Sequence, residues 1–184
     1  VEGVVAGLGV QLNNPQRSTN TVNTQAKILS GENIASVANF GMAARSQIPR
    51  SVISNELGND QNAGNLANFN DFSRLARTAS NAIAAVNRLA TTSQTIGSPA
   101  QDARAKAFAF LVLGQALGNL ALAYDSAAIV TPATPSDVVP GLSGAASVGV
   151  TALLMLDSAV LIANSPAATN GANGFPLPTT WISG

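Results

Sequence analysis

The stretch Ser98–Ala127, which reads SPAQDARAKAFAFLVLGQALGNLALAYDSA, decides the fold of this chain. A serine directly before a proline is typical of a helix start. The serine side chain caps free amides, and proline at the first helical position loses no hydrogen bond. A helix is therefore predicted from Pro99 to about Ala127. Its broad apolar face consists of Phe110, Leu113, Leu117, Leu120, Ala121 and Tyr124.

A second helix is predicted downstream, over Ser143–Asn164, where apolar residues are nearly continuous. The segment 131–142 separates the two helices and contains three prolines, which interrupt helices because they lack an amide hydrogen. The two helices are therefore expected to form an antiparallel hairpin.

Upstream, residues 71–92 carry the clearest helical pattern of the first half, with Asp71 as a candidate N-cap. Two shorter helical pieces are predicted within 21–44, with Gly41 ending or kinking the second piece. The polar stretch 45–69 is rich in Asn and Gly, which favour turns, and is predicted to be a long ordered loop. The apolar stripe of the 71–92 helix consists of Phe72, Leu75, Ala79, Ile83, Val86 and Ala90.

The C-terminal end, residues 165–184, is predicted to be a loop. The apolar segment Val1–Val10 is a candidate arm for a neighbouring molecule. The sequence therefore predicts a mostly α fold of antiparallel helical hairpins with long loops, as a bundle or a tetratricopeptide-like solenoid. Residues 1–184 are expected to form one helical domain.

The composition excludes several functional classes. Among 184 residues there is no cysteine and no histidine. Disulfides, zinc fingers, Ser-His-Asp triads and Cys-His dyads are therefore ruled out. The formal net charge is zero, so the basic footprint of a nucleic-acid-binding protein is missing. We predict no enzymatic activity, no cofactor, no metal and no nucleic-acid partner.

The charges are unevenly distributed. Residues 1–106 hold nine basic and six acidic residues, a formal charge of +3. Residues 107–184 hold no basic residue and only Asp125, Asp137 and Asp157, a formal charge of −3. We expect much of this second part to be buried in the fold itself, against further sequence, against a partner or in lipid.

The run Leu142–Ala163 is long enough to span a bilayer. However, Asp157 lies deep within it, and a central aspartate costs about 2.5–3.5 kcal/mol on insertion scales. No basic cluster flanks the run. We therefore favour two buried helices of a soluble bundle, with Asp157 facing Lys106 or Arg104 across the hairpin.

Taken together, five segments resemble the RagB/SusD family of outer-membrane nutrient-binding lipoproteins. They occur in the family's order and cover most of the chain, but they correspond to about the first half of a family member. The segments are Leu12–Arg17, Asn39–Met42 with Pro49–Arg50 and the loop Asn55–Asn62, Asp102–Phe110 running on to Leu120–Ala127, Leu154–Ala159, and Phe175–Ile182.

The resemblance implies a helical, tetratricopeptide-like protein at the cell surface of the outer membrane. Such a protein captures oligosaccharides or peptides without cleaving them and delivers them to a TonB-dependent, SusC-like transporter. Family members carry a lipidated N-terminal cysteine and a longer C-terminal part. We therefore expect this chain to be the N-terminal part of a longer protein, with the lipidation site upstream of Val1 or absent.

Four residues are candidate ligand contacts. Trp181 lies in a Pro-rich segment and could offer a flat apolar face to a sugar ring, although docking onto the helices is the favoured interpretation. Asn55, Asn59 and Asn62 offer amides for hydroxyl groups, against the simpler interpretation of a solvated loop.

A second hypothesis assigns the chain to another functional class, that of structural proteins. Low charge, small residues and few aromatics also suit a self-assembling filament or surface-layer subunit, a homo-oligomer built from Ala-rich helices. The native mass separates the two hypotheses, because only the second predicts a homopolymer.

Overall fold

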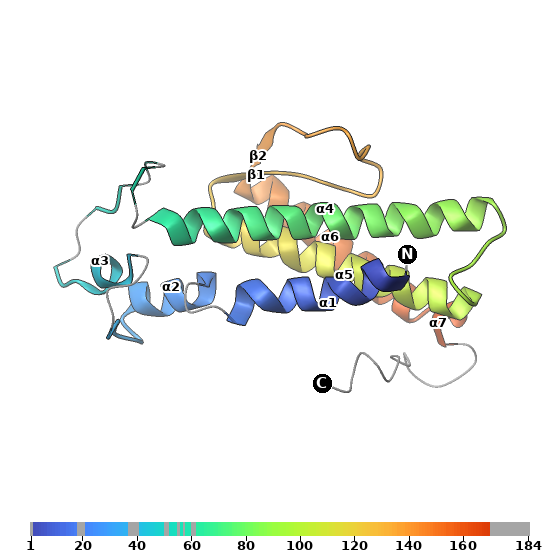
Figure 1. The fold of residues 1–184 in the computed structure, drawn as a ribbon, viewed down its shortest axis with the longest axis horizontal. Helices are drawn as coiled ribbons and strands as arrows, with labels where there is room; N and C mark the ends of the chain where they lie inside the picture. The colour runs from blue at the N-terminus through green and yellow to red at the C-terminus, as the bar shows by residue number, and fades with distance from the viewer. Residues whose placement is uncertain are drawn as a thin grey trace. The chain divides into compact units, whose positions relative to one another are not determined.

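The computed structural model describes residues 2–17, 21–36, 41–49, 52–54, 56, 58–59 and 62–169. These residues are mostly helical, which confirms the mostly α part of the predicted fold class (Figure 1). The helices are α1 (Glu2–Arg17), α2 (Val22–Ser30), α3 (Met42–Ser46), α4 (Ala63–Thr91), α5 (Pro99–Ala123), α6 (Ala145–Ala163) and α7 (Pro166–Thr169), and the strands are β1 (Ser126–Ala128) and β2 (Leu142–Gly144).

The chain divides into two compact units. The first consists of Val1–Leu12 and Phe72–Gly184, and the second is Asn13–Asp71. Helices α5 and α6, the two strands and most of α4 belong to the first unit. The expectation of one folding domain over the whole chain stays a prediction.

Helix α5 begins where the sequence predicts. The Ser98 hydroxyl oxygen accepts a hydrogen bond from the Gln101 amide at 3.2 Å, and Pro99 occupies the first turn. One turn further, the Asp102 carboxylate accepts a hydrogen bond from the Ile96 amide at 2.8 Å. The first bond satisfies an amide that a helix start leaves unpaired, and the second holds the preceding segment to the first turn, so the start of α5 is determined locally.

Helix α5 ends at Ala123, a few residues before the predicted end near Ala127. The backbone becomes extended at Tyr124, and β1 pairs antiparallel with β2. The Asp125 carbonyl oxygen also accepts a hydrogen bond from the Ala145 amide at 2.9 Å. Pairing with a strand that begins 14 residues after β1 ends therefore replaces the last predicted turn of helix.

Helix α6 packs antiparallel on α5 through small residues. Methyl groups placed at Gly118 and Gly149 would lie 3.9 Å and 3.7 Å from the Cβ atoms of Ala152 and Ala121. At Gly114 there is no room at all, because a Cβ would lie 2.7 Å from Leu156 Cγ and 3.0 Å from the Ala152 carbonyl oxygen. The two backbones approach closely only because this position carries no side chain.

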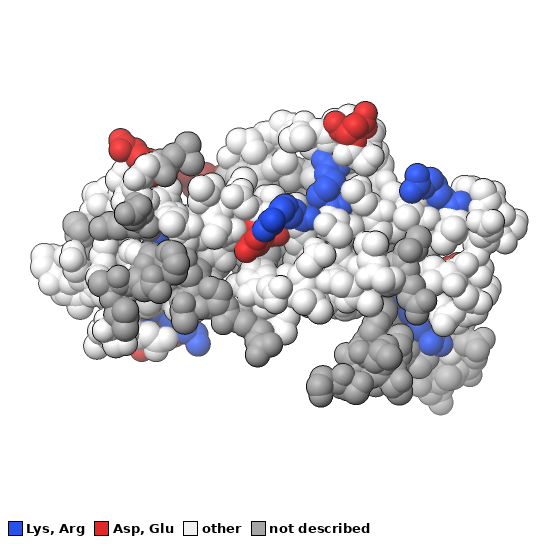
Figure 2. Space-filling view, in the orientation of Figure 1, with Lys and Arg blue, Asp and Glu red and all other residues white. Residues whose placement is uncertain are grey.

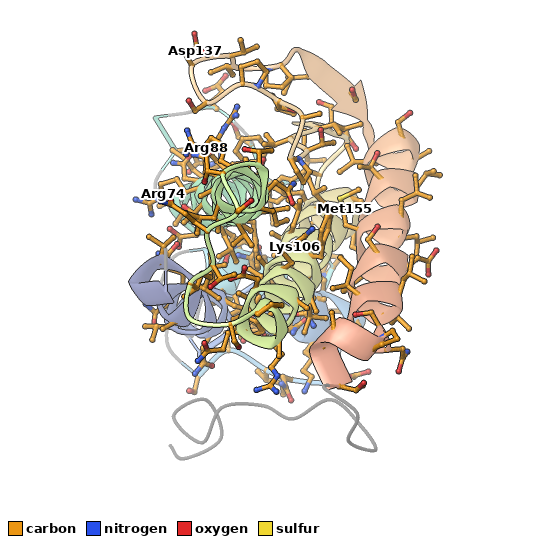
Figure 3. All side chains as sticks on the ribbon, turned by 90° about the vertical axis from the view of Figure 1, so that its right-hand side faces the viewer. Arg74, Arg88, Lys106, Asp137 and Met155 are labelled. Atoms are coloured by element: carbon orange, nitrogen blue, oxygen red, sulfur yellow. The ribbon has the colours of Figure 1, made fainter. Side chains whose placement is uncertain are left out.

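Helix α4 lies beside α5 (Figures 1 and 3). Its stripe residues Phe72, Leu75 and Ile83 are buried, as the spacing predicts. Two other side chains of α4 donate hydrogen bonds to the long 131–141 connection. The Arg77 guanidinium donates to the Pro135 carbonyl oxygen at 3.0 Å, and the Ser80 hydroxyl donates to the Thr131 carbonyl oxygen at 2.7 Å.

The prediction of a continuous loop over 45–69 is wrong at its end, because α4 already begins at Ala63. Within this early part, the Asn68 side-chain amide donates to the Gly64 carbonyl oxygen at 2.9 Å. Asparagine and glycine are poor helix formers in isolation, so the sequence signal is weak here. Local and tertiary hydrogen bonds override that preference.

The extended arm expected over Val1–Val10 is also wrong, because Glu2–Arg17 is helical and even includes Pro15. Val5 and Leu8 are buried one turn apart. A side chain at Gly9 would meet Phe108 of α5 at 3.5 Å, so this part of α1 lies against α5. Burial of Val5 and Leu8 offsets the cost of helical glycines, which is about 1 kcal/mol each.

In the second unit, α2 confirms the first short helix predicted within 21–44. Thr21 caps its start, with the hydroxyl oxygen accepting from the Thr24 amide at 3.1 Å, and Gly31 ends it with φ of 83°. The second predicted piece is wrong where it is described, because residues 34–36 are not helical. Gly41 does not end a helix either, since it begins α3 as its N-cap.

The close contact at Gly114 makes a testable prediction. We expect Gly114→Ala to lower the free energy of unfolding by about 1–3 kcal/mol in urea denaturation, because the new methyl group overlaps Leu156 and the Ala152 backbone. Gly118→Ala, one turn further on the same helix, is the matched control. Its methyl group has room, so we expect it to be neutral or stabilising by up to about 1 kcal/mol. Equal stability of the two variants would contradict the packing described above.

Candidate functional site

Two of the four candidate ligand contacts fall in the part of the chain that the structure describes. Asn59 and Asn62 share one turn before α4, because the Asn62 amide donates to the Asn59 carbonyl oxygen at 2.8 Å. Asn55 and Trp181 lie outside the described residues. The structure therefore brings two of the four candidates together.

The Asn59 side chain also holds this turn in place. Its amide donates to the Ser54 carbonyl oxygen at 2.8 Å, and its backbone amide donates to the Glu56 carbonyl oxygen at 3.0 Å. Both Asn59 and Asn62 are half-buried. A turn that is held by its own side chain has a defined shape, which lowers the entropic cost of ordering it around a ligand.

The second unit also contains a buried arginine that the sequence does not reveal. Arg45 of α3 is only 2% exposed, and its guanidinium donates to the Asn65 side-chain oxygen at 2.9 Å. Burial lowers the pKa of Arg45, yet arginine remains charged because its ordinary pKa is far above neutrality.

Arg45 therefore contributes a fixed positive charge to a polar interior. Thr21, Gln25 and Asn68 are buried in the same unit. No periodicity singles out Arg45, since its partner Asn65 lies 20 residues away. A guanidinium can only donate hydrogen bonds, so the acceptor oxygen of Asn65 is a suitable partner. The arrangement positions α3 against the beginning of α4.

We expect Arg45→Ala to lower the free energy of unfolding by about 1–3 kcal/mol, because Asn65 loses its donor and the packed arginine stem is removed. The matched control is Arg88→Ala, which removes an exposed arginine from α4 and should change stability by less than about 0.5 kcal/mol. Thermal and urea unfolding of both variants measure the difference. If the free energy of unfolding decreased equally little in both variants, Arg45 would have no structural role.

A different surface stands out on α6. Five large apolar side chains on this helix are exposed, and together with Asp157 they form what we call the outer stripe. They are Val150, Leu153, Leu154, Val160 and Leu161, with exposed fractions between 55% and 74%. In Figure 3, side chains of α6 project on the side away from α5. Soluble monomeric proteins rarely expose so many large apolar side chains together on one helix.

Length and composition alone would allow two described helices to cross a membrane. Helix α5 has a mean hydropathy of 1.4 and is half buried, which is typical of a core helix. Helix α6 has a mean hydropathy of 2.0, but only 17% of its most apolar stretch of 18 residues is buried. The expectation that both helices are buried is therefore wrong for α6 within the described part of the chain.

The expected pairing of Asp157 with Lys106 or Arg104 is also wrong, as no ion pair joins these residues in the described structure. Leu156 packs at Gly114, so Asp157 lies about two helical turns from the level of Lys106. Arg104 instead donates to the Ala168 carbonyl oxygen of α7 at 3.3 Å. Asp157 itself is exposed.

Charged side chains are sparse over the face in Figure 2, with basic and acidic groups scattered among uncharged ones. Within the described ranges, no group of three or more acidic side chains could hold a metal ion. The distinctive features of the described residues are therefore the polar turn of Asn59 and Asn62, the buried Arg45 and the outer stripe of α6.

Comparison with known proteins identifies no relative. No family model matches the chain, and neither a curated protein nor a solved structure does.

Proposed function

We propose that this chain is a non-catalytic binding protein of the RagB/SusD type. It captures oligosaccharides or peptides at the outer-membrane cell surface and delivers them to a TonB-dependent, SusC-like transporter. The observation that carries the proposal is the polar turn of Asn59 and Asn62, held by the Ser54 carbonyl oxygen. It lies in one of the five segments that resemble the family.

Further support comes from the arrangement of helices. Consecutive helices α4, α5 and α6 lie side by side, and α5 and α6 are antiparallel. We propose that these hairpins stack in the tetratricopeptide-like manner of the family. The chain also lacks histidine and cysteine, the most versatile catalytic side chains, which favours binding over turnover.

The single tryptophan provides a direct binding assay. Because Trp181 is the only tryptophan, the indole emission of the whole chain reports on this residue. We expect oligosaccharides such as maltoheptaose, xylohexaose or laminarihexaose to shift or quench this emission, with at least one member of the panel saturating. Chromatography of the sugar afterwards should show no cleavage.

Variants of the candidate residues sharpen the test. Calorimetric titration should show affinity for the same sugar reduced at least tenfold in Trp181→Ala, because stacking on the ring is lost. Asn62→Ala should reduce affinity several-fold, whereas Asn119→Ala on α5 should leave it unchanged. A folded protein that binds neither the sugar panel nor a pool of short peptides would overturn the proposal.

The alternative function, a self-assembling structural subunit, is favoured by one specific observation, the exposed outer stripe of α6. Light scattering between low and high micromolar concentration distinguishes the two. Growth of the particle mass with concentration supports the structural subunit, and a constant monomer mass together with sugar binding supports the nutrient-binding protein.

A further inference from the structure

Asp157 lies at the centre of the outer stripe. At about 100° of rotation per residue, the five apolar residues of the stripe fall within an arc of about 120°, and Asp157 lies at its middle. The stripe runs from Val150 to Leu161, a length of about 16 Å along the helix axis. It is therefore an apolar surface about three turns long with one negative charge at its centre.

The opposite side of α6 is already occupied. Val148, Ala152 and Ala159 are buried there, and Leu156 packs against α5 at Gly114. Among the described residues, nothing covers the outer stripe, and no basic side chain pairs with Asp157. Residues 107–184 contain no lysine or arginine, so this part of the chain has no cation of its own for Asp157.

A two-fold symmetric contact with a second copy of the chain fits this stripe poorly. In a two-fold symmetric contact the same surface meets itself. Because Asp157 lies about 2 Å along the axis from the midpoint of the stripe, such a contact would bring the two carboxylates close together. Two like charges removed from water destabilise an interface by several kcal/mol.

Lipid fits the stripe poorly for a related reason. Asp157 is exposed on the very face that would meet the acyl chains, with no partner among the described residues to neutralise it. The cost of a central aspartate, about 2.5–3.5 kcal/mol, would then be paid in full. Protein interfaces, in contrast, accommodate such a charge when the partner supplies an opposite one.

We propose that the outer stripe of α6 is a docking site for an amphipathic helix of a partner protein. The partner helix carries apolar residues at positions i, i+3, i+4 and i+7 and a single lysine or arginine at the centre of that face. Its apolar side chains cover Val150, Leu153, Leu154, Val160 and Leu161, and its cation pairs with Asp157. The charge sets the register and excludes helices that carry an acidic residue at that position.

The test uses two synthetic helical peptides of about five turns that differ at one position. Both carry leucines at the stated spacing, and the central residue of the apolar face is Lys in one and Glu in the other. Fluorescence anisotropy with the full chain should show at least fivefold tighter binding of the Lys peptide. The preference should diminish in high salt, because dissolved ions screen the attraction between the peptide lysine and Asp157.

Charge reversal provides the decisive comparison. In Asp157→Lys the preference should invert, so that the Glu peptide binds at least fivefold more tightly than the Lys peptide. The matched control is Asp137→Lys, which makes the same change of charge in the exposed 131–141 connection and should keep the wild-type preference. Leu153→Ser combined with Leu154→Ser should weaken both peptides at least tenfold.

Several outcomes would overturn the proposal. If neither peptide bound, the docking of a partner helix would be contradicted. If both bound equally, Asp157 would have no role in selecting the partner. Self-association that is abolished by the Leu153→Ser and Leu154→Ser changes would assign the stripe to a second copy. Partitioning into phosphatidylcholine vesicles, together with no peptide preference, would assign it to lipid. None of these outcomes affects the sugar-binding test, so the two proposals fail independently.

Discussion

The close approach of α5 and α6 at Gly114 is the contact on which the structure of the first unit depends. With the Ala152 carbonyl oxygen and Leu156 this near, only a residue without a side chain fits. The contact sets both the distance between the helices and their register. It thereby turns Val148, Ala152 and Ala159 inward and leaves the larger apolar residues of α6 facing away from the bundle.

This choice of faces runs against a simple sorting of residues by hydrophobicity. Two alanines, Ala152 and Ala159, are buried on α6 together with Val148, whereas larger residues such as Leu153 and Leu161 on the same helix are exposed. Close packing explains the inner face, because small side chains allow backbones to approach and gain many weak contacts. It also means that the largest apolar side chains of the helix, among them Leu153 and Leu161, remain exposed.

The second unit is stabilised differently. Its interior contains Thr21, Gln25, Arg45 and Asn68, so hydrogen bonds there accompany apolar burial by residues such as Ile28 and Met42. Buried polar groups are costly unless each is paired, and a network of paired groups specifies one arrangement. The bond between Arg45 and Asn65 thus accounts for an early start of α4 that helix propensity alone would not produce.

By itself, the sequence determined the features that depend on neighbouring residues. The start of α5 at Ser98, the stripe of α4 and the mostly helical class could all be predicted, because caps and periodicity act within one or two turns. Only the tertiary structure decided the helix over Glu2–Arg17, the early start of α4 and the outward direction of Asp157. Each of these depends on a contact between residues far apart in the chain, and no local pattern records such a contact.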